Sequence, residues 1–193
     1  MTDASTAGAA RPEPRPPQMQ EAIRLHYQGC EGDRTAAIRA ESMLAELATT
    51  SPADPVIQAY LGSARLLAAA RAWQPIRKME LCKEGGSLLD GAVAAAPDNL
   101  EIRFLRGASL YHLPGLFGKR PQAEADFRWV TEHVHNGSLP ADLAAAAFYF
   151  DGLTYARQRN QPAARQAWQT AIELAPDSKA GKDSAAKLAA RRE

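Results

Sequence analysis

His26 and Cys30 are the two residues whose types and spacing come closest to a chemical site. They lie four residues apart, so on a helix both side chains would point the same way and could reach one metal ion. Zinc, the metal that suits this pair, requires four protein ligands, or three and a water molecule. The chain offers no second close pair, because His133 and His135 are two residues apart and would face different sides of a helix. We therefore expect no metal site.

Catalytic motifs are also missing from the sequence. It contains no Gly-x-Gly-x-x-Gly fingerprint, no phosphate-binding loop of the form Gly-x-x-x-x-Gly-Lys-Ser/Thr, and no serine in a nucleophile turn ordered with the histidine and aspartate of a triad. The stretch from Gly115 to Lys119 lacks both the spacing of a phosphate loop and a preceding strand. We therefore expect no catalytic residues, no cofactor and no enzymatic activity.

The composition indicates one domain without a strongly charged surface. With 193 residues, 46% of them hydrophobic, the chain can bury one sizeable core. The 23 basic and 22 acidic residues give a net charge of +1 and are spread along the chain, so no stripe of one sign can collect phosphates. We expect no nucleic-acid partner.

The hydrophobic runs and the two cysteines indicate the cellular compartment of the protein. No apolar run reaches the length of about 18 residues that a membrane-spanning helix needs, so we expect no membrane insertion. The opening residues MTDASTAGAARPEPRPPQ have neither the basic head nor the apolar middle of a secretory signal, which predicts a cytoplasmic protein. In a reducing compartment, Cys30 and Cys82 are expected to be small packing side chains.

Residues 1–17 are expected to form a disordered tail. Four prolines stand there among alanine, arginine and glutamate, a composition that cannot bury apolar surface. A short proline-rich docking peptide is the alternative interpretation. The helical pattern starts at Gln18, which predicts one helical repeat domain over residues 18–193.

Residues 145–178 show the clearest structural pattern, a hairpin of two helices separated by Asn160-Gln161-Pro162. Apolar and small residues recur at steps of three and four in both arms, which is the spacing of one helix face. A glycine in the first arm and an alanine in the second would let the helices approach closely. The repeating positions are Phe148, Gly152 and Tyr155 in the first helix, then Ala164, Trp168, Ala171 and Pro176 in the second.

This pattern resembles the tetratricopeptide repeat, a helix-turn-helix unit of about 34 residues. Three other segments fit less completely, around Gly107 and Phe127, around Gly62 and Leu89, and around Ala40 and Leu44. The resemblance implies an all-α fold, a right-handed stack of about four hairpins of a bacterial type with extended helices. The thin apolar stripe of residues 178–192 predicts a C-terminal capping helix that closes the stack.

Two segments depart from the reference unit. The long spacing from Gly62 to Gly85 makes the second hairpin about three helical turns taller, and Gly85-Gly86 in its return helix predicts either a close crossing or a hinge. The turn from Leu113 to Pro121 is longer than usual and contains Leu116 and Phe117. These apolar side chains either fold back onto the hairpin or contact another molecule.

Arg106 and Asp151 form a predicted structural pair. Each stands just before the repeat glycine of its hairpin, in consecutive repeats, where equivalent positions of neighbouring first helices can touch. A buried carboxylate needs a partner, so we expect these opposite charges to satisfy one another, with Arg103 as an alternative donor.

The resemblance also implies where a partner binds, because in this family the first helices line a concave face that holds a peptide or helix. The alternative is that these side chains pack on each other or on the N-terminal helix. Carried over by position, the predicted partner-binding residues are Leu105, Tyr111, His112, Tyr149, Leu153 and Arg157.

The favoured function is therefore a non-catalytic adaptor or assembly factor that binds a protein or peptide. One alternative is a carrier of a small apolar ligand, held in a cavity that the tall second hairpin and the loop from Leu113 to Pro121 enclose. Another is a self-associating scaffold, a homo-oligomer whose exposed ridge pairs with a second copy.

Overall fold

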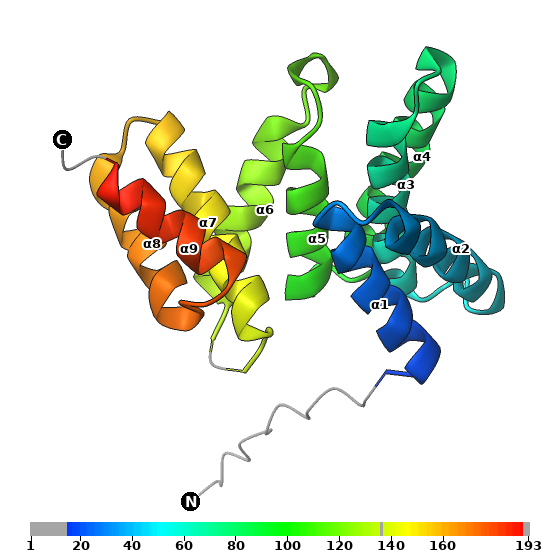
Figure 1. Ribbon diagram of the computed structural model, residues 1–193, viewed down its shortest axis with the longest axis horizontal. Coiled ribbons are helices and arrows are strands. Elements are labelled where there is room, and N and C mark those ends of the chain that lie inside the picture. The colour runs from blue at the N-terminus through cyan, green and yellow to red at the C-terminus, as the bar shows by residue number, and fades with distance from the viewer. Residues whose placement is uncertain (1–14, 136, 191–193) are drawn as a thin grey trace, which may run out of the picture.

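The chain folds into a stack of helical hairpins in the computed structural model, which describes residues 15–135 and 137–190 (Figure 1). These residues form nine α-helices, one short 3-10 helix and no β-strand. Successive helices pair as α1 with α2, α3 with α4, α5 with α6 and α7 with α8, while α9 packs on α7 and α8. The helices are α1 Pro17–Cys30, α2 Arg34–Thr50, α3 Pro55–Arg71, α4 Pro75–Ala95, α5 Leu100–Tyr111, η1 Gly115–Phe117, α6 Arg120–His133, α7 Ala141–Arg157, α8 Gln161–Leu174 and α9 Lys179–Ala189.

Capping side chains and prolines set where the helices begin. The Asp33 and Asp54 side chains accept hydrogen bonds from the first-turn N–H groups of α2 and α3, and Pro55 occupies the first turn of α3. At α5 the cap is Asn99, whose side chain accepts from the Ile102 amide at 3.0 Å, and not the neighbouring Asp98. Asparagine and aspartate cap equally well, so the sequence could not choose between them.

Each of the four hairpins closes at a glycine where its helices cross, and the α3–α4 hairpin has two glycines there, Gly62 and Gly85. A Cβ at Gly85 would meet the Gly62 carbonyl oxygen at 2.6 Å, and a Cβ at Gly152 would lie 2.6 Å from Cδ1 of Trp168. Gly107 approaches the Phe127 ring in the same way. A Cβ at Gly29 would meet Cβ of Ala37 at 2.6 Å, so Gly29 belongs to the crossing of α1 and α2. Side chains larger than hydrogen at these positions would force the helices apart.

Gly86 differs from Gly85, its neighbour in α4. The close crossing predicted for the two glycines is confirmed at Gly85 only, because a Cβ at Gly86 would meet nothing within 4 Å. Cys82, one turn earlier, is buried as predicted, whereas Cys30 at the end of α1 is exposed.

The N-terminal end of the described chain is fixed to the middle of the stack. Helix α1 begins at Pro17, and Arg15 just before it donates to Glu101 on α5, with 2.9 Å between Nη1 and Oε1. Residues 15–17, which the predicted tail included, are therefore part of this ordered start. The rest of the predicted tail, residues 1–14, lies outside the described residues.

In the loop from Leu113 to Pro121, the two apolar side chains differ in their exposure. Gly118, at a φ of 62°, supports the sharp bend after η1. Phe117 folds back and packs against the main core, whereas Leu116 remains 79% exposed.

Replacing Gly152 with alanine tests the close crossing. We expect Gly152→Ala to lower the free energy of unfolding by about 1–3 kcal/mol, because the new methyl group overlaps the buried Trp168 ring. Thermal or urea unfolding measures this. Gly86→Ala is the matched control, and it should stabilise by about 0.5–1 kcal/mol because the site has room and alanine favours helix. Equal stability of the two variants would contradict the crossing model.

Candidate partner-binding site

Three of the six predicted partner-binding residues gather around one ring that the sequence analysis missed, Phe150 on α7. The Phe150 ring centroid lies 5.2 Å from that of Tyr111, 5.8 Å from that of His112 and 5.4 Å from that of Tyr149. Edge-on ring contacts of this kind stabilise one another. We call Tyr111, His112, Tyr149 and Phe150 the aromatic patch. Its members come from two neighbouring repeats and all keep some exposed surface.

Cationic side chains lie at the edge of the aromatic patch. The Arg120 guanidinium sits over the Tyr111 ring, 4.7 Å from its centroid. Partial burial, together with the nearby charge of Arg120, lowers the pKa of His112 below its usual value. The exposed Arg157 is held by Glu124 on α6, with 2.8 Å between Nε and Oε1. Leu153, one turn beyond Tyr149, is partly buried on the same helix.

Leu105 is not available to a partner. It is only 2% exposed and belongs to the main core, so its assignment to a binding surface is wrong. The reason is that α5 is packed on several sides, because it contacts α3, α4 and α6.

At the N-terminal end of the stack, side chains of α1, α3 and α5 pack on one another. Ser63 on α3 lies 3.1 Å from Nε2 of His26 on α1 and accepts a hydrogen bond of 2.8 Å from Ser109 on α5. Tyr60 is fully buried beside them, and its hydroxyl donates to Glu101. Self-packing, left open by the sequence, therefore holds at this end of the stack.

His26 and Cys30 do approach one another, with 3.6 Å between Nε2 and Sγ, but they belong to this packed network. Within residues 15–135 and 137–190, no three histidine, cysteine or acidic side chains converge as metal ligands would. Burial lowers the pKa of His26 to about 4, because the charged form would lose its water. The network is thus a packing feature of α1 and α3.

The predicted pair of Arg106 and Asp151 is not the pairing that forms. Arg106 donates twice to Asp126 on α6, at 2.7 and 2.8 Å, and once to Asp90 on α4, at 3.1 Å. Asp151 instead accepts from Arg128 at 3.2 Å and from Thr131 at 3.1 Å, both on α6. Burial still raises the pKa of Asp151, and Arg128 offsets part of that effect. Both residues point to second helices and not along the row of first helices.

A cleft of about 320 Å³ lies between α4 and the loop after α5. Leu110, Leu113 and Phe117 line one side, and Met79 and Cys82 line the other. This is where the carrier hypothesis placed a cavity. The cleft is not enclosed, however, because Met79 at its rim is exposed.

Comparison with solved structures identifies the architecture. Over 89% of this chain and 81% of the other, the fold matches TTC0263, a thermophilic TPR protein from Thermus thermophilus, with a TM-score of 0.58 and 18% identity. A MamA RS-1 double mutant aligns over 90% of this chain and 92% of its own, with a TM-score of 0.47 and 18% identity. The chain has a TPR-like fold. No protein-family model and no curated protein matches the sequence.

The TPR-like fold confirms the predicted resemblance and the all-α stack of hairpins with a C-terminal capping helix. None of the helices in the described part of the chain is both long and apolar enough to cross a membrane.

Buried His26 predicts a loss of stability in acid. Unfolded, the imidazole binds a proton below its ordinary pKa of about 6.5, whereas in the folded chain it does so only near pH 4. As the pH falls from about 6.5 to 4, the unfolded state is therefore favoured by up to about 3 kcal/mol. Urea unfolding at several pH values measures this. His26→Gln should show a shallower pH dependence over this window, and an identical slope would contradict the assignment.

The Asp126 cluster predicts a large effect of one buried carboxylate. Asp126→Ala should lower the free energy of unfolding by about 3 kcal/mol, because the partly buried guanidinium of Arg106 loses its main partner. The control is Asp183→Ala, which breaks the exposed pair with Lys179 and should cost less than about 0.5 kcal/mol. Equal costs in chemical denaturation would mean that Asp126 does not hold α5 against α6.

Proposed function

We propose that this protein is a non-catalytic scaffold that binds a partner protein, as a peptide or helix, through the aromatic patch. The observation that carries the proposal is the patch itself, in which the exposed ring of His112 and three partly buried rings are joined across two repeats. A folded domain gains nothing in solubility by leaving such rings at its surface. Tyrosine and arginine side chains, on the other hand, dominate the energetic centres of protein interfaces.

The neighbourhood of the patch favours a peptide over a flat protein surface. Arg120 already lies over Tyr111, and Arg157 projects from the end of α7. These cations can donate to a carboxylate or a backbone carbonyl while the rings cover an apolar side chain. Tyr149 and Leu153 extend the same surface along α7, which suits a segment lying along that helix.

The TPR-like fold is compatible with this role, since a stack of hairpins presents side chains from several repeats on one surface. Only part of that surface is open here. The first two hairpins fill it with His26, Tyr60 and Ser63, so the proposed site is limited to α5 and α7.

Replacing the rings of the aromatic patch tests the proposal. A photo-reactive benzoylphenylalanine at position 112 should cross-link to a partner protein in a lysate of the source cells. The same probe at Arg165, which is exposed on α8, should not. The double variant His112→Ala, Tyr149→Ala should reduce capture of that partner roughly tenfold or more, as expected when interface aromatics are lost.

The control for this experiment is Arg165→Ala, which should leave capture unchanged. Circular dichroism would verify that both variants remain folded. Capture that survives loss of both rings would place the binding surface elsewhere on the molecule.

A further inference from the structure

A second surface lies where the α3–α4 hairpin and the α5–α6 loop project at the same end of the stack, at the top of Figure 1. Four of the five large hydrophobic side chains that are exposed within the described residues belong to these two projections. Trp73 is 86% exposed and Ile76 is 77% exposed on the hairpin, where Met79 follows, and Leu116 lies on the loop. Exposed apolar groups concentrated in this way mark a surface that another molecule covers.

The cleft described above lies between these projections. Its volume, about 320 Å³, is at the lower end of the range for pockets that hold whole ligands. Its rim is open at Met79, Lys83 and Ser87, which are all exposed. A space of this size and shape fits one or two apolar side chains of a molecule that lies across it.

Gly86 supplies an independent reason to regard the cleft as a binding site. Glycine inside a helix costs about 1 kcal/mol relative to alanine. At Gly85 that cost has a structural reason, because the Gly62 backbone lies against it. Gly86 lines the cleft, and a Cβ there would touch nothing within 4 Å. The missing side chain therefore keeps the cleft deep without helping the helices to pack.

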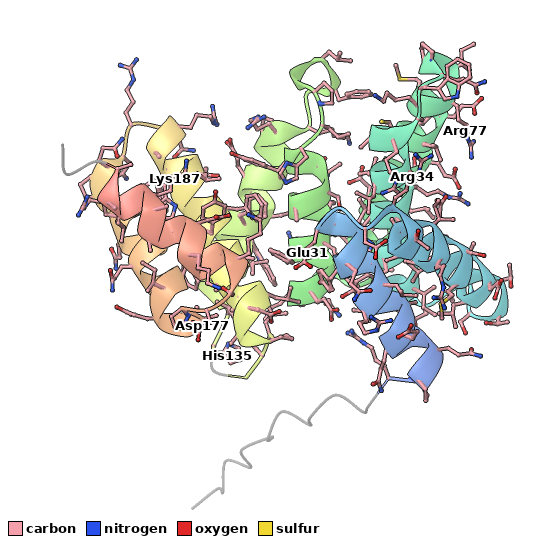
Figure 2. All side chains as sticks on the ribbon, viewed as in Figure 1. Glu31, Arg34, Arg77, His135, Asp177 and Lys187 are labelled. Atoms are coloured by element: carbon pink, nitrogen blue, oxygen red, sulfur yellow. The ribbon has the colours of Figure 1, made fainter. Side chains whose placement is uncertain are left out.

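The charge around the cleft selects the partner. Residues 71–90 and 113–120 contain six basic side chains and three acidic ones. Asp90 is already bound by Arg106, Lys119 and Gln122. Arg77, labelled on the projecting hairpin in Figure 2, pairs with Glu80. Lys78 and Lys83 are exposed and form no ion pair within the described part of the chain. The net charge around the cleft is therefore positive, and this charge lies beside exposed apolar side chains.

We propose that this end of the molecule, which we call the tip cleft, binds an acidic amphipathic segment of another protein. One or two bulky apolar side chains of the segment enter the space beside Gly86, and its carboxylates pair with Lys78 and Lys83. A membrane surface could also meet exposed apolar tips and cations, but a flat lipid surface would leave the space beside Gly86 unfilled. The tip cleft shares no lining residue with the aromatic patch and does not depend on the function proposed for it.

The test uses the full chain and two synthetic helical peptides. Both carry leucine along one face, and the other face carries glutamate in one peptide and lysine in its match. Fluorescence anisotropy should show binding of the glutamate peptide with a Kd below roughly 100 µM, and binding at least about tenfold weaker for the lysine peptide. Gly86→Leu, which fills the cleft, should weaken binding of the glutamate peptide at least about tenfold.

Matched variants separate this site from the rest of the surface. Gly91→Leu places the same side chain on the exposed face of the same helix and should leave the affinity unchanged. Lys83→Glu should weaken the glutamate peptide and strengthen the lysine peptide. The double variant His112→Ala, Tyr149→Ala should bind the glutamate peptide as the unmodified protein does, so failure of the aromatic-patch proposal would not affect this result.

Several results would overturn the proposal. They include no binding of the glutamate peptide, equal binding of both peptides, and an affinity that Gly86→Leu does not change. Binding to phosphatidylglycerol vesicles that Trp73→Ala abolishes, without peptide binding, would assign the tips to a lipid surface. A solution mass that doubles with concentration, and no longer doubles in Gly86→Leu, would assign the cleft to a second copy of the chain.

Discussion

Near contact between the two helices of each hairpin is the constraint on which the rest of the molecule depends. At Gly29, Gly62 with Gly85, Gly107 and Gly152, the facing atoms leave no room for a methyl group. Large side chains such as Phe127 and Trp168 then pack around the crossing and are fully buried. Because van der Waals attraction falls steeply with distance, separation of one pair would loosen its own core and the surface on which the next pair packs.

Charged side chains join the two helices of one hairpin and also join one hairpin to the next. Arg106 ties α5 to α6 through Asp126 and to α4 through Asp90, and Arg128 ties α6 to Asp151 on α7. Such pairs add little net stability, because both partners must be removed from water, but losing one partner is costly. They therefore oppose sliding of one hairpin on another more than they drive folding. The aromatic patch and the tip cleft are both formed between hairpins, so both require this fixed arrangement.

The sequence predicted the hairpins well and their lateral contacts poorly, for a physical reason. The spacing of Gly107 and Gly152 reports a local helix crossing, and that local pattern is confirmed. The partner of Arg106 depends on how second helices turn toward it, which no spacing along one helix encodes. Leu105 was misplaced for the same reason, since it lies in the main core, where α5 packs on several neighbouring helices. Phe150 carried a weak signal, an aromatic next to Tyr149, but its role appears only when α5 brings Tyr111 and His112 to it.

The contact between Arg15 and Glu101 makes the two ends of the stack unequal. It spans 86 positions of the chain and connects the start of α1 directly to the third hairpin, whereas α8 and α9 pack mainly on α7 and on each other. In a linear array, local opening begins where the fewest neighbours must be released. We therefore expect that α8 and α9 can open without breaking a long-range ion pair, whereas opening at the start of α1 must break the one between Arg15 and Glu101. The two ends of the stack therefore differ in what must break before they open, although the hairpins share one architecture.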